Sequence, residues 1–121
     1  MQKTILVVED TEDSRQMMKF LLEMFGYIVI EAEDGQQAVK SATEHHPDLI
    51  LMDMSMPVMD GLTATKAIRK FDGVNQIPII AVTAFGNQIY KSAIEAGCNE
   101  LISKPIDFNM LKPVIEKYLA Y

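Results

Sequence analysis

Short apolar runs alternate with helix-like segments along the whole of this chain. Five runs, over residues 4–8, 27–32, 48–52, 77–82 and 100–103, have the length of buried strands. Between them, apolar residues recur at helical spacing, and each set predicts one stripe that faces the core. These sets are Met17, Phe20, Leu21 and Met24; Ala38, Val39 and Ala42; Ala64, Ala67, Ile68 and Phe71; and Ile89, Ala93 and Ala96.

Glycine and proline mark the ends of the predicted helices. Gly26 and Gly97 follow the first and fourth helices, at positions where a left-handed residue commonly terminates a helix. Pro47 stops the second helix. Pro113 falls inside the last helical pattern, so we expect the regular part of that helix to begin near Met110, with Pro113 in its first turn.

Five strands alternating with five helices predict an α/β fold, a doubly wound parallel sheet of five strands covered on both faces. We expect one domain over residues 1–121, because a chain of this length with 49% hydrophobic residues can bury a single core. In such sheets, ligands bind beyond the carboxyl ends of the strands, where the winding reverses. For the strand order 2-1-3-4-5, that point lies between the first and third strands.

The charge of the chain excludes some classes of function. A net charge of −6 without a stripe of Lys and Arg argues against a nucleic-acid partner. No apolar stretch is long enough to span a bilayer and no signal peptide is evident, so we expect a cytoplasmic protein without membrane contact. Cys98, the single cysteine, cannot form an internal disulfide and is expected to be a buried thiol.

Acidic residues end two of the predicted strands. Glu9 and Asp10 follow the first strand, and Asp53 follows the third. In a parallel sheet these strand ends can meet, and three carboxylates so close together would repel one another and call for a cation. The alternative is that Asp10 and Asp53 are helix N-caps, a role in which Asp is favoured.

The fourth and fifth strands bring complementary groups to the same edge. Thr83 supplies a hydroxyl and Lys104 an ammonium, although each alone would pass for an ordinary strand threonine and a solvated lysine. The carboxylates could hold Mg²⁺, which prefers oxygen ligands and commonly binds a phosphate as well. Asp53 would then attack the phosphorus of a transferred phosphoryl group, whose oxygens Thr83 and Lys104 would bind.

In this order and at these strand ends, the motifs resemble the receiver domain of two-component response regulators, the CheY-like family, over essentially the whole chain. The matching elements are Glu9-Asp10, Asp53 with the following Met56-Pro57-Val58-Met59-Asp60-Gly61, Thr83-Ala84, Ala96-Gly97 and Lys104-Pro105. The resemblance implies a flavodoxin-like fold and a phosphoryl group taken from a phosphohistidine of a sensor kinase or a phosphotransfer protein.

The resemblance also implies a role for each site residue. Asp53 would be the phosphoacceptor, and Asp10 and Asp53 would ligate Mg²⁺ directly with the carbonyl of Ser55. Glu9 would act through metal-bound water. The Lys104–Pro105 peptide bond is expected to be cis.

Glu9 and Leu101 depart from the commonest family pattern, and Glu9 replaces the more frequent Asp of the acidic pair. Leu101 stands where many members carry a Tyr or Phe whose rotamer reports phosphorylation, so coupling is expected to run through Thr83 and the backbone. Phe85 and Ser55 occupy positions similar to those that tune hydrolysis of the acyl phosphate. Phe85 would either shield the phosphoryl group from water or simply cover the edge of the sheet.

A small apolar patch is expected to carry the output. Tyr90 and Ile94 lie on the fourth helix, rotated away from its buried stripe, and Leu101 and Val114 would border them. In domains that resemble this one, the surface binds a downstream protein partner, so we expect either such a partner or a dimer formed on phosphorylation. Incidental exposure is the alternative.

Three other functions fit the pattern less well. A Mg²⁺-dependent phosphatase with an aspartyl-phosphate intermediate would need an Asp-x-Asp after the first strand and a cap domain. The sequence shows neither feature. A flavodoxin-like electron carrier would need a hydroxyl-rich and glycine-rich phosphate loop after the first strand. The segment 9–13, with four acidic residues, stands there and would repel the phosphate of FMN. A pseudo-receiver that only binds partners would not need the intact acidic site.

Overall fold

The computed structural model describes residues 2–56 and 58–120, so Pro57 of the Asp53 loop lies outside the described residues. The strands are β1 (Thr4–Val8), β2 (Ile28–Ala32), β3 (Leu49–Asp53), β4 (Ile79–Thr83) and β5 (Glu100–Ser103), and they alternate with α1 (Glu12–Met24), α2 (Gly35–His45), α3 (Gly61–Ile68), α4 (Gly86–Ala96) and α5 (Phe108–Leu119). The predicted strands are therefore confirmed, with β2, β3 and β4 beginning one or two residues later than expected.

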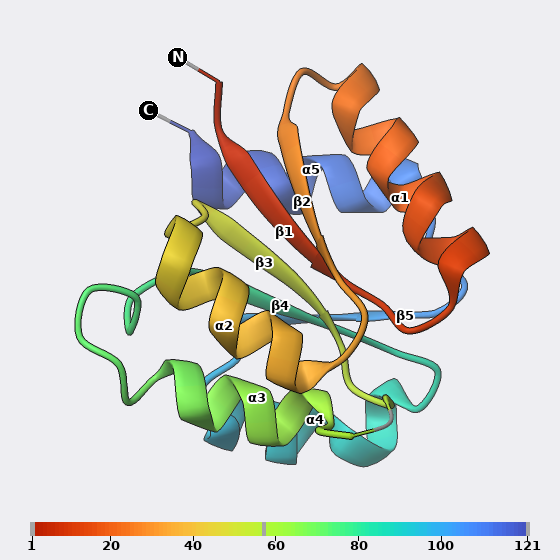
Figure 1. Ribbon diagram of the computed structural model, residues 1–121. Helices are drawn as coiled ribbons and strands as arrows, with labels where there is room; N and C mark the ends of the chain where they lie inside the picture. Colours follow the sequence, from red (N-terminus) through yellow and green to blue (C-terminus); the bar gives the residue numbers. More distant parts are fainter. Residues whose placement is uncertain (1, 57, 121) are drawn as a thin grey trace.

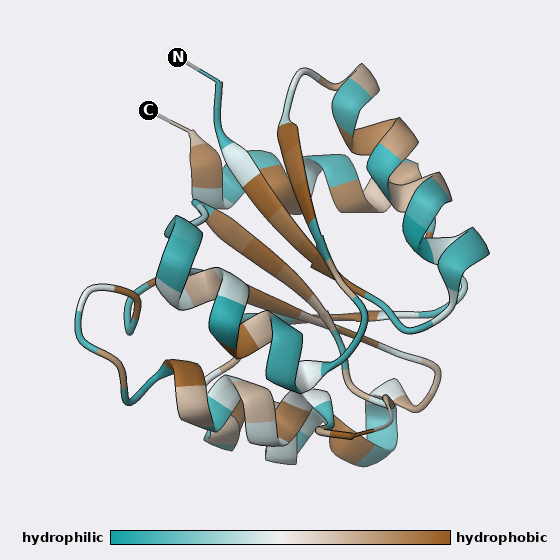
Figure 2. Cartoon of the chain, in the orientation of Figure 1, coloured by the Kyte–Doolittle hydropathy of each residue, from teal (hydrophilic) through white to brown (hydrophobic). Residues whose placement is uncertain are grey.

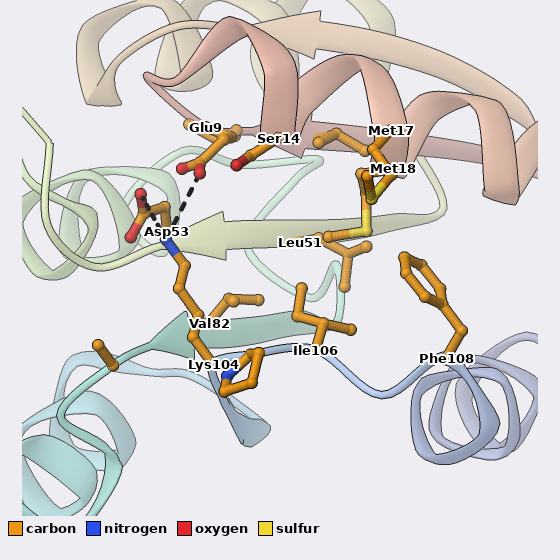
Figure 3. A pocket seen from close by; sticks show the side chains of 14 residues that line it. Glu9, Ser14, Met17, Met18, Leu51, Asp53, Val82, Lys104, Ile106 and Phe108 are labelled. Atoms are coloured by element: carbon orange, nitrogen blue, oxygen red, sulfur yellow. Dashed lines mark hydrogen bonds and ion pairs between the residues drawn. The ribbon is translucent and has the colours of Figure 1, made fainter.

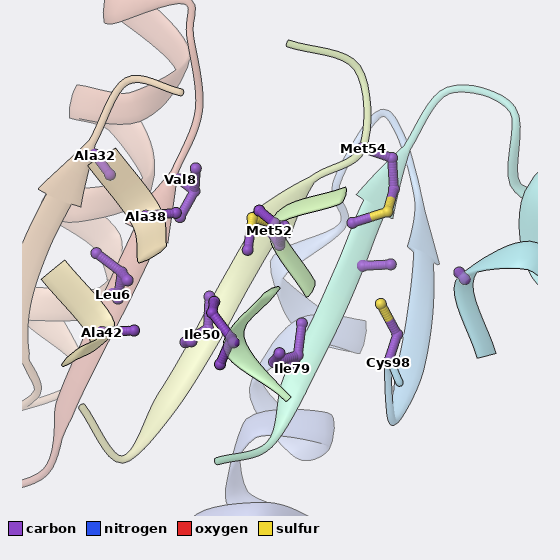
Figure 4. Close-up of a cluster of buried hydrophobic side chains, with 14 of the residues drawn as sticks. Leu6, Val8, Ala32, Ala38, Ala42, Ile50, Met52, Met54, Ile79 and Cys98 are labelled. Carbon is purple, nitrogen blue, oxygen red and sulfur yellow. The ribbon is translucent and has the colours of Figure 1, made fainter. Parts of the chain in front are cut away.

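All strand pairs are parallel, and the sheet order is β2-β1-β3-β4-β5, as predicted. Helices cover both faces of the sheet (Figure 1). On one face, α2, α3 and α4 pack on side chains such as Leu6, Ile50 and Ile79 (Figure 4). On the other, α1 and α5 pack on Ile5 and Leu51. The strands between them are mainly apolar, as their brown colour in Figure 2 shows.

The predicted core stripe of α1 is wrong. Met17, Phe20 and Met24 are 61%, 63% and 66% exposed, and the buried residues of this helix are Arg15, Met18 and Leu22. The helix carries two apolar stripes about 100° apart, and spacing alone does not say which one faces the sheet. The buried stripe was missed because a charged residue, Arg15, belongs to it.

The other three predicted stripes face the core. Ala38 and Ala42 of α2, Ala64 and Ile68 of α3, and Ala93 and Ala96 of α4 are buried, whereas Phe71 lies beyond the end of α3 and is 48% exposed. Cys98 is a buried free thiol, as expected.

The helix ends follow the local signals, with one exception. Gly26 and Gly97 have φ of 97° and 118°, in the left-handed region predicted for them. The last helix begins at Phe108 and not near Met110. Asp107 is its N-cap, and the Asp107 side chain accepts a hydrogen bond from the amide of Asn109. Pro113 thus lies inside α5 instead of in its first turn. Pro113 and Asn109 are both exposed, so water can satisfy the carbonyl that the proline leaves without a donor.

None of the described helices has the length and apolar character needed to cross a membrane.

Candidate functional site

The carboxylates of β1 and β3 meet at the carboxyl edge of the sheet. Val8 pairs with Met52, so the residues that follow each of them come side by side. Carboxylate oxygens of Glu9, Asp10 and Asp53 all lie within 4.8 Å of one another. The predicted convergence of these three groups is therefore present in the fold.

Burial differs within this cluster. Glu9 and Asp53 are only 8% and 4% exposed, whereas Asp10 is exposed. The Oε2 atom of Glu9 is buried and has no hydrogen-bond partner among the described residues. A buried acceptor without a donor is costly. The donor set of oxygens only, with one oxygen unpartnered, fits a hard divalent cation such as Mg²⁺.

Lys104 neutralises part of this charge. Its Nζ lies 3.4 Å from Oε1 of Glu9 and 3.4 Å from Oδ2 of Asp53 (Figure 3). Burial opposes the charge of Lys104, but the carboxylates of Asp53 and Glu9 outweigh it and raise the pKa of the ammonium. Lys104 therefore stays protonated and is fixed beside the candidate nucleophile.

Burial also acts on Glu9. It raises the pKa of Glu9 from 4.5 to about 7, helped by the neighbouring Asp53 and opposed in part by Lys104. One ammonium therefore does not fully balance the carboxylates, and without a metal Glu9 binds a proton more readily than an ordinary glutamate does.

The helix-cap interpretation of Asp10 and Asp53 is wrong. The N-cap of α1 is Thr11, and no side chain caps that helix. The Oδ1 of Asp53 instead accepts a hydrogen bond from the amide of Ser55 at 3.1 Å. Asp60 is the residue that caps α3, by accepting from the amide of Thr63 at 2.8 Å.

Thr83 and Lys104 are held together by the backbone. The amide of Lys104 donates to the carbonyl of Thr83 at 2.7 Å, and the Lys104–Pro105 bond is cis, as expected. The Thr83 hydroxyl oxygen accepts from the amide of Phe85 at 3.0 Å, which links this hydroxyl to the N-cap residue of α4.

Two features of the site were not anticipated from the sequence. Gly61 lies so close to β3 that a Cβ there would stand 2.3 Å from the carbonyl oxygen of Asp53. A cavity of about 540 Å³ also extends from Asp53 and Lys104 along the α1 and α5 side of the sheet, between Met17 and Phe108 (Figure 3). No short-range pattern marks this cavity, because its walls come from strands and helices distant in sequence.

The four residues of the expected output patch differ in exposure. Tyr90 and Ile94 are 56% and 38% exposed. Leu101 and Val114 are half-buried, and they pack against the cores on opposite faces of the sheet. Phe85 is 55% exposed, which is compatible with both of its predicted roles.

Comparison with known proteins shows the family. The family model described as "Response regulator receiver domain" matches residues 5–116. The polar-differentiation response regulator DivK of Brucella ovis is 40% identical to this chain over 121 residues, which cover 99% of this chain and 98% of that protein.

Solved structures agree with this result. The receiver domain of the sensor histidine kinase PA1611 of Pseudomonas aeruginosa PAO1, which holds a magnesium ion in its active site cleft, superposes with a TM-score of 0.93 at 34% identity and full coverage of both chains. The chemotaxis protein CheY4 of Vibrio cholerae gives a TM-score of 0.92 at 28% identity, covering 98% of this chain and all of that one. The chain therefore belongs to the receiver domain family of two-component response regulators.

Proposed function

We propose that this receiver domain stores a signal as a phosphoryl group on Asp53. The observation that carries the proposal is the position of the Asp53 carboxylate. It is 4% exposed, lies 3.4 Å from the Lys104 ammonium, and faces the carboxylates of Glu9 and Asp10 at the edge of the sheet where ligands bind.

Asp10, Asp53 and the carbonyl of Ser55 would hold the divalent cation, and Glu9 would contact it through a bound water. Mg²⁺ would supply positive charge that neutralises the phosphoryl oxygens and the carboxylate cluster. The oxygen donor set and the unpartnered Oε2 of Glu9 support this assignment.

The phosphoryl donor would be a phosphohistidine of a sensor kinase or a phosphotransfer protein. A carboxylate oxygen of Asp53 attacks phosphorus, the P–N bond breaks, and the electron pair leaves with the imidazole, which then takes a proton. Lys104 stays charged and donates to a phosphoryl oxygen. In this reaction the chain would modify its own Asp53 side chain, and it would act as a signalling domain rather than as an enzyme with a separate substrate.

Thr83 would report the modification. While its oxygen accepts from the amide of Phe85, its hydroxyl hydrogen can donate to a phosphoryl oxygen. Movement of Thr83 toward that oxygen would shift the start of α4, which carries the exposed Tyr90 and Ile94. We infer that this surface meets a downstream protein or a second copy of the chain, inside the cytoplasm.

The test is phosphorylation by a small phosphodonor with Mg²⁺, followed by intact-mass measurement. We expect the gain of one phosphoryl group, which Asp53→Asn abolishes and Asp10→Asn severely weakens. Asp60→Asn is the matched control, because Asp60 caps α3 and takes no part in the cluster. Equal labelling of Asp53→Asn, or labelling in excess EDTA, would refute the proposal.

A further inference from the structure

Helix α1 contributes a buried arginine that the proposed phosphotransfer does not use. Arg15 is 6% exposed, on the side of α1 that packs on the sheet with Met18 and Leu22. A buried guanidinium is costly unless its donors are satisfied, so its partners indicate why it is there.

The guanidinium joins three segments of the chain. Its Nε lies 3.0 Å from Oε1 of Glu31 and its Nη2 lies 3.5 Å from Oε1 of Glu33, near the end of β2. Its Nη1 donates to the main-chain carbonyl of Glu9 at 2.9 Å, and this hydrogen bond is buried. Arg15 therefore connects α1 and β2 to the first residue of the carboxylate pair.

The contact with the Glu9 carbonyl has a geometric consequence for both members of that pair. A peptide group is planar, so this carbonyl and the Cα atoms of Glu9 and Asp10 lie in one rigid plane. The amide of Glu9 is held separately, by donation to the carbonyl of Ala32 at 3.1 Å. With the amide fixed by β2, the bond from Arg15 sets the rotation of the plane that carries Glu9 and Asp10.

We propose that Arg15 is a positioning residue, which orients the Glu9–Asp10 peptide so that both carboxylates converge on the cation at the edge of the sheet. This inference rests on the metal site of the proposed function. Residues that orient metal ligands by hydrogen bonding commonly matter for affinity: their removal typically weakens metal binding 10- to 100-fold.

Electrostatics and positioning predict opposite signs for the loss of Arg15. Removing a nearby positive charge should, by Coulomb's law alone, strengthen the binding of a cation. Loss of a positioning hydrogen bond should weaken it. Lys19 provides a matched control, because its Nζ lies 3.4 Å from Oε2 of Glu31, in the same network, and this contact does not involve the Glu9 carbonyl.

In the experiment, the unphosphorylated protein is titrated with MgCl₂, and the changes in amide NMR shifts give the Kd. We expect Arg15→Met to raise the Mg²⁺ Kd about 10-fold, Arg15→Lys to raise it less, and Lys19→Met to leave it unchanged or lower it slightly. The carbonyl ¹³C shift of Glu9 should move in Arg15→Met and stay in place in Lys19→Met. That signature reports the hydrogen bond directly, independently of overall stability.

An unchanged or lower Kd in folded Arg15→Met, or an equal weakening in Lys19→Met, would overturn the positioning role. If Arg15→Met does not fold, Arg15→Lys decides the question, because one ammonium cannot hold Glu31 and the Glu9 carbonyl as the guanidinium does; an unchanged Kd there also overturns the role. Failure of the metal site itself would appear differently, as a parent protein that shows no Mg²⁺-dependent shifts at the carboxylates.

Discussion

Repulsion inside the carboxylate cluster should make the metal-free protein more stable when Asp53 loses its charge. Asp53→Asn keeps the shape of the side chain and an oxygen that can accept from the amide of Ser55. It removes the negative charge that helps to raise the pKa of Glu9. We expect the substitution to stabilise the fold without Mg²⁺, although it removes the proposed phosphoacceptor.

The magnitude follows from the pKa of Glu9. A rise in the pKa of Glu9 from 4.5 to about 7 means that its ionisation costs about 3 kcal/mol more in the folded state than in the unfolded state, at about 1.4 kcal/mol per pH unit. Burial and Asp53 both raise this pKa, so we expect relief of the repulsion, less the loss of the Asp53–Lys104 ion pair, to be on the order of 1 kcal/mol. For a domain of this size, that corresponds to a rise in Tm of about 4 °C.

The effect should depend on pH in a defined direction. The folded state binds a proton on Glu9 more tightly than the unfolded state, so this contribution to stability is complete below pH 4.5 and is lost as the pH rises through about 7. The parent protein in EDTA should therefore melt at a lower temperature at pH 8 than at pH 5. The advantage of Asp53→Asn should be largest at pH 8 and small at pH 5.

Thermal unfolding followed by circular dichroism, in EDTA and in a MgCl₂ series, measures these differences. Mg²⁺ bound at the proposed site would stabilise the native state, so it should raise the Tm of the parent much more than that of Asp53→Asn. Asp60→Asn is the control and should gain little at either pH, because its carboxylate is exposed and outside the cluster. A lower Tm for Asp53→Asn at pH 8 in EDTA would show that the carboxylates do not repel one another as described.

Three further predictions concern other parts of the fold. Val58 has a φ of 68°, which is strained for a β-branched residue, so Val58→Gly should raise the free energy of unfolding by about 1 kcal/mol in urea titrations; a loss would contradict the strain. Gly61→Ala should lower it by several kcal/mol, because its Cβ would stand 2.3 Å from the Asp53 carbonyl oxygen; an unchanged urea midpoint would show that the β3–α3 loop can yield. Tyr90→Ala should weaken binding to a downstream partner or a second copy of the chain, measured by calorimetry or sedimentation, without reducing phosphorylation of Asp53. Equal binding would remove Tyr90 from the output surface.

The strand pattern was readable from the sequence because the strands are short apolar runs that end in polar residues. Parallel strands bring their carboxyl ends to one edge, so Glu9, Asp53 and Lys104 could be placed together from their positions alone. Chemistry located at strand ends needs no knowledge of how the helices rotate.

Helix rotation and long-range polar contacts were not readable in this way. Met17 and Met18 are neighbours of similar hydrophobicity, yet one is 61% exposed and the other 8%, because the packing of α1 on the sheet decides between them. Arg15 is charged and therefore excluded from any core pattern. Its partner Glu31 lies 16 residues away on β2, so only the folded sheet shows that the two charges pair.

The contact between Lys104 and Glu9 joins residues 95 positions apart in the chain. Non-local contacts of this kind form only after the intervening loops have closed. A polypeptide still being synthesised cannot complete the cluster until its fifth strand has left the ribosome. Under the role proposed for Lys104, a truncated or partly unfolded copy would lack this ammonium at the site and would not accept a phosphoryl group.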